Sequence, residues 1–310
     1  MTALICGSFA YDNIMSFQDR FKNHILPDKV HILNVCFLVP AMRREFGGCA
    51  GNIAYNLQLL GGDGKPMGAV GNDFKSYAEW MKKIDISQDH VMVVDEAYTA
   101  QAFITTDLDD NQITAFHPGA MDFAHTQAIP LDAGVTLGSV SPDGRQAMIQ
   151  HAEQFAAANI PFIFDPGQGL PMFDGAELDT FIDQASYVTV NDYEMQLLHD
   201  RTGHNEEQIS QRVEALIVTQ GAQGSKIFHQ GNEIQIPAIK VDDIKDPTGC
   251  GDAYRAGLIY GIMNGLDWQT TGQIASLLGA IKIQQHGTQN HNFTFDQFQH
   301  QYEIAYGTTF

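Results

Sequence analysis

The sequence predicts an α/β fold with a central, mostly parallel sheet and helices on both faces. In the C-terminal part of the chain, apolar runs end at intervals of 26, 26 and 28 residues, at Ser139, Asp165, Asn191 and Thr219. Each interval contains one helical pattern of apolar residues, which indicates a series of strand–helix units. Runs such as Phe162–Phe164 are continuously apolar. Strands that are covered on both faces require such runs.

The hydrophobic and charged fractions are those of an ordinary globular protein. The 310 residues carry a net charge of −20, which argues against nucleic acid or an anionic membrane as the main partner. An anionic nucleotide is still compatible, because backbone amides and Mg²⁺ bind phosphate groups locally. We therefore expect small-molecule ligands, with no nucleic acid and no membrane partner. Both a monomer and a homodimer fit the sequence.

The cysteines and the N-terminal residues favour a cytoplasmic protein. The four cysteines form no CxxC pair, so reduced thiols are expected at Cys6, Cys36, Cys49 and Cys250. The N-terminal residues lack basic side chains and a long apolar run, so they are interpreted as a first strand rather than a signal peptide. No uninterrupted apolar stretch is long enough to span a bilayer.

A first candidate site follows the first strand. The apolar run Ala3–Cys6 is followed by Gly7 and Ser8, and Asp12 comes shortly after. Ligands of open α/β sheets bind beyond the carboxyl ends of the strands. A carboxylate at Asp12 suits hydrogen bonding to a sugar diol. The alternative is an aspartate in a turn that caps a local amide, which composition alone would favour.

Two segments interrupt the strand–helix alternation. Residues 31–39 are extended in pattern, and so are residues 99–106 and 113–117, with a turn at 109–111 between the last two. We expect insertions at about 13–45 and 97–118 to come together as a small β lid.

Glycines open a helix at Gly47 and Gly48, and Gly51 and Asn52 follow in its first turn. Apolar residues at helical spacing continue from Ile53. Glycine allows a sugar to approach the backbone, and Asn52 offers both a donor and an acceptor to hydroxyl groups. The alternative is a glycine turn with an asparagine near a helix start.

Two further motifs follow strands in the C-terminal half. Asn191 and Glu194 are three residues apart at a strand–helix junction, which suits either a hydrated Mg²⁺ or a helix capping box. The loop from Thr219 to Ser225 contains Gly221 and Gly224, but it lacks the Gly-Lys-Ser/Thr of a P-loop.

The strongest motif is Asp246-Pro-Thr-Gly-Cys-Gly-Asp252, which is followed by small and apolar residues at helical spacing. Amides at a helix start are unpaired and carry the positive end of the dipole. The backbone N–H groups of Gly249, Cys250 and Gly251 would form an anion hole, and Asp252 would be a general base beside it. The alternative is a glycine-rich turn before an ordinary helix.

This last motif resembles the second signature of the PfkB, or ribokinase-like, carbohydrate kinase family. The upstream stretch Phe46-Gly-Gly-Cys-Ala-Gly-Asn-Ile-Ala54 resembles the first signature of the same family. The resemblance extends over essentially the whole chain, and the stretch Asn111–Met121 is closest to the adenosine kinase branch. It implies a single ribokinase-like domain over residues 1–310 whose small β lid closes over a sugar site.

The resemblance also implies roles for individual residues. Asp12, Ser8, Gly48 and Asn52 would bind the substrate, and Asn191 and Glu194 would organise phosphate and Mg²⁺, with Glu194 acting through water. ATP would contact Thr219, Gly221, Gly224 and Asn290. In relatives, the positions of Asp246 and Thr248 help to hold a monovalent cation, typically K⁺, so such a site is implied here.

A purine base would be held by lid aromatics, with Phe37 and Phe116 as the expected residues and Phe103 as a weaker candidate. The chain departs from the family where asparagine often follows the Asp-Pro that ends a C-terminal strand. Here Gln168 follows Asp165-Pro-Gly, and Gln168 is assigned to the substrate side.

The predicted function is phosphoryl transfer from MgATP to the ribose 5′-hydroxyl of a purine nucleoside, with adenosine as the preferred substrate and Asp252 as the base. A sugar kinase such as ribokinase, and a non-catalytic binding relative, are the alternatives.

Overall fold

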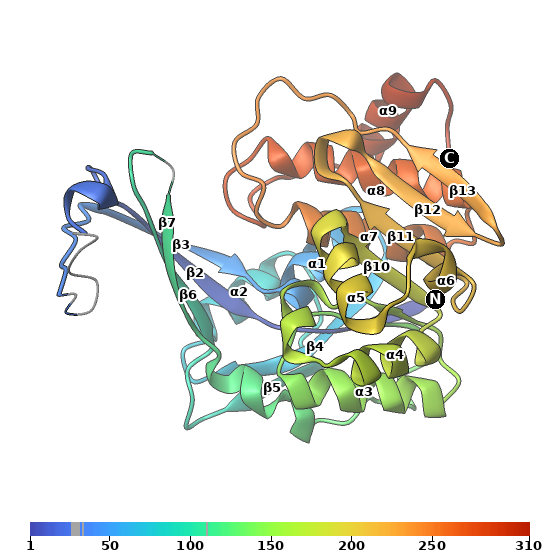
Figure 1. The fold of residues 1–310 in the computed structure, drawn as a ribbon, viewed down its shortest axis with the longest axis horizontal. Coiled ribbons are helices and arrows are strands. Elements are labelled where there is room, and N and C mark those ends of the chain that lie inside the picture. The colour runs from blue at the N-terminus through green and yellow to red at the C-terminus, as the bar shows by residue number, and fades with distance from the viewer. Residues whose placement is uncertain (26–31, 33, 110) are drawn as a thin grey trace.

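The computed structural model describes residues 1–25, 32, 34–109 and 111–310. These residues form a nine-stranded sheet in the order β13-β12-β11-β10-β9-β8-β1-β4-β5 (Figure 1). Its strands are β1 Thr2–Cys6, β4 Asp63–Gly71, β5 His90–Val94, β8 Val135–Val140, β9 Phe162–Phe164, β10 Tyr187–Asn191, β11 Ala215–Thr219, β12 Ser225–His229 and β13 Asn232–Ile236. The strands from β11 to β5 pair in parallel, and β12 and β13 are antiparallel.

Helices cover both faces of this sheet, as predicted. Along β1, Ala3 and Ile5 belong to one core cluster, whereas Leu4 and Cys6 belong to the other. This alternation follows from the period of two in a strand, because successive side chains point to opposite faces. The helices on the first face are α1 Cys49–Leu59, α2 Lys75–Lys83, α7 Cys250–Met263, α8 Trp268–Ile283 and α9 Phe295–Tyr306. Those on the second face are α3 Arg145–Ala157, α4 Gly175–Gln184, α5 Asp192–Thr202 and α6 Glu206–Ser210. Short 3₁₀ helices lie at Phe21–Asn23, Gly119–Thr126, Gly167–Met172 and Gly221–Gln223.

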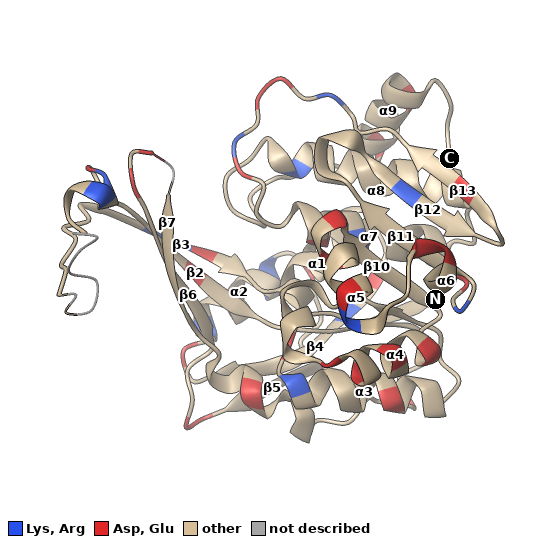
Figure 2. Ribbon diagram, in the orientation of Figure 1, with Lys and Arg blue, Asp and Glu red and all other residues tan. Residues whose placement is uncertain are grey.

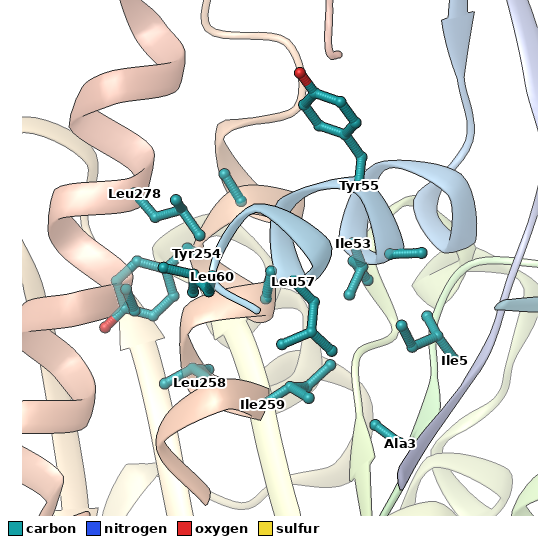
Figure 3. Packing of buried hydrophobic residues seen from close by; sticks show 14 of the residues in the cluster. Ala3, Ile5, Ile53, Tyr55, Leu57, Leu60, Tyr254, Leu258, Ile259 and Leu278 are labelled. Atoms are coloured by element: carbon teal, nitrogen blue, oxygen red, sulfur yellow. The ribbon is translucent and has the colours of Figure 1, made fainter. Parts of the chain in front are cut away.

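The packing of α1 against α7 positions the candidate site. Leu57 of α1 and Ile259 of α7 belong to the first core cluster and lie close together, beside Ala3 and Ile5 of β1 (Figure 3). Each is fully buried, which is worth roughly 1.5–3 kcal/mol for a large aliphatic side chain. The N-terminal turns of these two helices are thereby fixed relative to each other.

A four-stranded sheet, called the small sheet here, projects from the main body (Figure 1). Its order is β3-β2-β6-β7, with bounds β2 Ala10–Ser16, β3 Ala41–Gly47, β6 Ala100–Thr106 and β7 Gln112–His117. β6 and β7 lie where the sequence predicted strands, and the connecting turn at 109–111 includes residue 110, which lies outside the described residues. The closing motion of a lid stays a prediction.

One predicted strand was wrong. Residues 34–39 have no regular secondary structure, and the strand of this segment is β3 at Ala41–Gly47. Residues 31 and 33 of the predicted run lie outside the described residues. β3 contains Met42-Arg-Arg-Glu45, which is charged and largely exposed, so its pattern gave little strand signal. Over the described residues, the helices are too short or too polar to cross a bilayer.

Candidate functional site

The N-terminus of α7 forms the centre of the site. Gly249 precedes the helix with φ of 79°, in the left-handed region that glycine adopts without steric cost. The Cys250 amide donates to the carbonyl of Pro247 at 3.1 Å. The amides of Gly249, Gly251 and Asp252 donate to no protein acceptor in the described parts of the chain. Such amides at a helix start are suited to an anion.

Asp252 lies in the first turn of α7 and is held by α1. The Asn52 side-chain amide donates to Asp252 Oδ2 at 2.8 Å. Burial raises the pKa of Asp252 to about 6, although the Asn52 hydrogen bond and the charge of Arg255 oppose this rise. A carboxylate with this pKa is ionised at neutral pH and is a stronger base than an exposed aspartate.

Arg255 lies one turn after Gly251 and connects α7 to two strand ends. Its Nη2 atom donates to Asp165 Oδ1 at 2.8 Å, and the two side chains are 8% and 3% exposed. The same nitrogen lies 3.9 Å from Glu194 Oε2. Because a buried charge is costly without a partner, this pair fixes the position of Asp165 relative to α7.

The start of α1 supplies the second side of the site. Gly48 has φ of 88°, and a side chain there would meet the carbonyl of Ser8 and the amide of Ala10. The Ser8 hydroxyl accepts from the amide of Cys49 at 3.3 Å. The glycine therefore lets the end of β1 and the start of α1 lie backbone to backbone.

Asn52 is also fixed from the other side. Its Oδ1 atom accepts from Gln289 Nε2 at 3.0 Å, and Gln289 Oε1 accepts from Trp80 Nε1 at 2.9 Å. Asn52 and Gln289 are buried. This network determines which way the Asn52 amide points, so its NH₂ group faces Asp252.

Asp12 lies on β2 beside Gly47, where a side chain in place of hydrogen would meet Asp12 Oδ2 at 2.6 Å. Burial raises the pKa of Asp12 to about 6, and the negative charges of Asp246 and Glu45 add to this rise. A sugar hydroxyl that donates to this carboxylate would replace part of the lost hydration.

The loop after α8 connects the small sheet to residues 246–251, which are called the anion-hole segment here. Asn290 Nδ2 donates to Glu45 Oε2 of β3 at 2.9 Å. The Gly287 amide donates to Asp246 Oδ2 at 2.9 Å, and the Thr248 amide donates to Asp246 Oδ1 at 2.9 Å. Asn290 is thus engaged with the small sheet in this conformation, and its contact with ATP stays a prediction.

The Asn191–Glu194 pair forms the capping box that the sequence left open as an alternative. Glu194 N donates to Asn191 Oδ1 at 2.7 Å, and Asn191 N donates to Glu194 Oε2 at 2.8 Å. Burial raises the pKa of Glu194, and the Arg255 charge opposes the rise. In the described ranges no three acidic, histidine or cysteine side chains gather as a metal site. A single carboxylate is compatible with Mg²⁺, which keeps waters and binds mainly phosphate in kinases.

The remaining residues that the sequence assigns to ATP lie at the same sheet edge. Thr219 of β11 pairs with Asn191 of β10, and both end their strands. Gly221 is open to its surroundings, whereas a side chain at Gly224 would collide with the carbonyl of Ile236. Carboxyl ends of parallel strands meet at one edge, so these residues share an edge with Ser8 and Asp165.

The two predicted lid aromatics lie in different places. Asp12 pairs with Ala102, which in turn pairs with Phe116 of β7, so Asp12 and Phe116 are on one face of the small sheet. Phe116 is 53% exposed. Phe37 packs against Phe17 and Phe21, with ring centroids 4.9 and 5.0 Å apart.

Phe103 and Gln168 are the two remaining candidates for the substrate side. Phe103 pairs with Asn13 and Ala115, which places it on the opposite face of the small sheet from Asp12. Gln168 is exposed in the 3₁₀ helix after β9. The roles of Phe37 and Gln168 in binding stay predictions.

Sequence reasoning missed Arg255, Asp165 and Gln289 as parts of the site. Arg255 is a charged residue in the otherwise apolar Ala253–Met263 stretch, and Asp165 ends an apolar strand. Either feature could have indicated a buried ion pair. No feature of the sequence indicates that Gln289 contacts Asn52, because only the fold brings the loop after α8 next to α1.

Comparisons with known proteins identify the family of this chain. A model of the pfkB family carbohydrate kinases matches residues 25–294. The chain is 30% identical over 266 residues to a nucleoside kinase of Methanocaldococcus jannaschii, which covers 85% of this chain and 87% of that protein.

Solved structures of Burkholderia thailandensis nucleoside kinase are also similar. The complex of that enzyme with inosine is 52% identical to this chain and has a TM-score of 0.91. The match covers 99% of this chain and 99% of that one. Its complex with ADP-inosine is 53% identical with a TM-score of 0.88, over 99% of this chain and 97% of that one. With the family model spanning most of its length, this chain belongs to the pfkB family of carbohydrate kinases and has their ribokinase-like fold.

Proposed function

We propose that this chain is an ATP-dependent nucleoside kinase that phosphorylates the ribose 5′-hydroxyl of a purine nucleoside, with adenosine as the first candidate substrate. The observation that carries the proposal is Asp252, a carboxylate of raised pKa that lies beside free amides at the N-terminus of α7. The relative with 52% identity was solved with inosine, which supports a nucleoside over a free sugar.

Asp252 would act as the general base. The Asn52 amide holds one carboxylate oxygen, which leaves the other for the proton of the attacking hydroxyl. Above a pH of about 6 the group is ionised and ready to accept this proton. Proton transfer to a positioned base typically contributes about 10²–10⁴-fold to the rate.

The transferring phosphoryl group would bind at the N-terminus of α7. The amides of Gly249 and Gly251 would donate to its oxygens, and the Cys250 amide would join them if it releases the Pro247 carbonyl. Phosphoryl transfer needs mainly positioning and charge stabilisation, which fixed amides supply. Mg²⁺ would neutralise phosphate charge when bound, with Glu194 as its water-mediated partner.

The two substrates would lie on either side of this helix start. On the nucleotide side, Thr219, Gly221 and Gly224 border the edge formed by β10 and β11. On the nucleoside side, Asp12 would bind the ribose hydroxyls, and Ser8 and Gly48 would border them. Phe116 shares the face of Asp12 and would stack on the base.

The direct test is ADP release from MgATP with a panel of adenosine, inosine, guanosine, cytidine, ribose and fructose 6-phosphate. Turnover confined to purine nucleosides is expected. Turnover with ribose or fructose 6-phosphate alone would reject the nucleoside assignment and retain a sugar kinase. If the protein is folded but releases no ADP with any acceptor, the kinase proposal is rejected.

Asp252→Asn tests the base in the same assay. This variant should still bind ATP but lose about 10²-fold or more in kcat, because the amide accepts no proton at neutral pH. The matched control is Asp296→Asn, which removes an exposed carboxylate from the first turn of α9 and should leave kcat unchanged. Near-normal turnover in Asp252→Asn would remove this residue from the base role.

A further inference from the structure

Lys282 is a buried cation next to the anion-hole segment. It lies in the last turn of α8, and its side chain is fully buried. Its Nζ atom donates to the carbonyl of Asp246 at 2.7 Å and to the carbonyl of Gln285 at 3.3 Å. A buried ammonium is costly without such partners, so its position points to a specific role for the charge.

The two carbonyls belong to the two loops that build the site. Asp246 begins the segment that leads to Gly249 and α7, and Gln285 begins the loop that reaches Asn52 through Gln289. The Gly287 amide joins the same loops by donating to the Asp246 carboxylate. The ammonium therefore ties the anion-hole segment to the loop that orients Asn52.

The surroundings of Asp246 do not fit the monovalent cation that the family resemblance implies. The Asp246 carboxylate is already engaged by the amides of Gly287 and Thr248. Its carbonyl is engaged by Lys282. A free cation that shared this carbonyl would lie in close contact with the ammonium, and two like charges repel at that distance.

We infer that the ammonium of Lys282 replaces this monovalent cation and holds the anion-hole segment in place for phosphoryl transfer, so that the enzyme works without K⁺. This inference rests on the proposed kinase function. Lys282 is a positioning residue, because it contacts the loops and not the reacting groups. The assignment of Asp246 and Thr248 as ligands of a free cation is thereby replaced.

The charge of Lys282 also acts on the site electrostatically. It helps to lower the pKa of Asp246, and it opposes the rise that burial causes in the pKa of the Cys250 thiol. A fixed positive charge behind the anion-hole segment would add to the helix dipole of α7 in attracting phosphate. Unlike a free ion, it is supplied by the chain and needs no binding equilibrium.

The first experiment needs no variant and no turnover. Thermal unfolding of the full chain, alone and with ADP, is measured in chloride salts of K⁺, Na⁺ and tetramethylammonium at equal ionic strength. We expect the same melting temperature and the same ADP affinity in all three salts. A melting temperature or ADP affinity that rises specifically with K⁺ would overturn the inference, whether or not the chain proves to be a nucleoside kinase.

The second experiment uses Lys282→Ala, which removes the ammonium and leaves room beside the two carbonyls. In tetramethylammonium, kcat should fall by roughly 10²-fold, the scale of a misplaced catalytic segment. Added K⁺ or methylammonium should restore a large part of kcat and raise the melting temperature, a rescue that a merely structural role would not show. Wild-type turnover in Lys282→Ala without added cation would overturn the inference.

Lys245→Met is the matched control. Lys245 directly precedes Asp246 in the loop between β13 and α7, where basic and acidic residues alternate (Figure 2). Its ammonium is partly exposed and pairs with Asp243 at 3.2 Å. This variant removes the same charge near the site and should change neither kcat nor the response to K⁺. If Lys282→Ala does not fold, Lys282→Arg keeps the charge and should stay independent of K⁺; activation of that variant by K⁺ would count against the inference.

Discussion

Asp252 and Asp246 lie on one short segment, yet their pKa values shift in opposite directions. Burial raises the pKa of Asp252 from 3.8 to about 6. Burial also acts to raise the pKa of Asp246, but hydrogen bonds from Gly287 and Thr248 and the charge of Lys282 lower it overall. The first carboxylate is kept reactive, and the second is kept ionised to hold the two loops together.

These shifts give opposite dependences of stability on pH. The folded state binds a proton at Asp252 more tightly than the unfolded state does, so its contribution to stability is lost as pH rises through about 6. Asp252→Asn should therefore raise the free energy of unfolding at pH 8 by about 1–3 kcal/mol, and by about half as much at pH 5, because that pH lies between the unfolded and folded pKa values. Urea unfolding at the two pH values measures this difference.

Asp246→Asn is the comparison. Its lowered pKa contributes stability above the ordinary value of 3.8, and this contribution is lost only as pH falls through the lower folded value. The variant should therefore be less stable than the wild type at both pH 8 and pH 5. Equal effects of the two substitutions at pH 8 would show that burial does not set the pKa of Asp252.

Some individual site residues could be predicted from the sequence and others could not. Asp252 and Asn52 belong to glycine-rich motifs, so both could be assigned, and the structure joins them directly. Lys282 could not be assigned, because it is a single charge within a helical pattern, and the pattern around Arg255 indicates a buried ion pair without naming its partner. Their roles depend on which loops and strand ends the fold brings to them.

At the scale of elements, the motif at the start of α5 has two interpretations, a helix cap and a part of the nucleotide site. Asn191 and Glu194 form a complete capping box, which accounts for their spacing without any ligand. Asn205 and Gln208 form the same capping box at the start of α6. The two boxes differ in position, because only the first lies 3.9 Å from Arg255 and beside the end of β11.

Substitutions in the two capping boxes distinguish a role of Asn191 in helix capping from a role in nucleotide binding. Asn191→Ala and Asn205→Ala should each lower the free energy of unfolding by about 1 kcal/mol, the usual value of an N-cap. Only Asn191→Ala should also raise the KM for ATP, because it releases Glu194 from its orientation. Unchanged ATP kinetics in Asn191→Ala, together with the expected loss of stability, would reduce Asn191 to a cap.

Strands were predictable where their sequence carried a clear hydrophobic pattern. The parallel strands β9 to β11 are buried on both faces, so their continuous apolar runs identified them. β3 is charged and exposed along most of its length, and an irregular segment before it is more apolar. Pairing with β2 makes β3 a strand, and that partner is distant in sequence.

At the scale of the whole molecule, the site is assembled from the main body and the small sheet. Asp12 belongs to the small sheet, whereas Asp252 belongs to α7 of the main body. The loop after α8 connects them, because Asn290 contacts Glu45 of β3 and Gln289 contacts Asn52 of α1. A movement of the small sheet would therefore change the position of the loop that holds Asn52, and Asn52 orients Asp252.

The two faces of the small sheet give the last prediction. Phe116 is on the face of Asp12, and Phe103 is on the opposite face; they are 53% and 41% exposed. If Phe116 stacks on a purine, Phe116→Ala should raise the KM for the nucleoside about tenfold, as expected for loss of one base–aromatic stack worth about 1–3 kcal/mol. The KM for ATP should stay unchanged.

Phe103→Ala removes an aromatic ring of similar exposure from the other face, so it should leave the nucleoside KM unchanged. Steady-state kinetics of both variants with adenosine and inosine make the comparison. Equal effects of the two substitutions would mean that the rings act through the stability of the small sheet. No effect of Phe116→Ala would place the base elsewhere, because the register of β2, β6 and β7 leaves Phe116 as the exposed aromatic ring on the face of Asp12 among the strand residues that the structure describes.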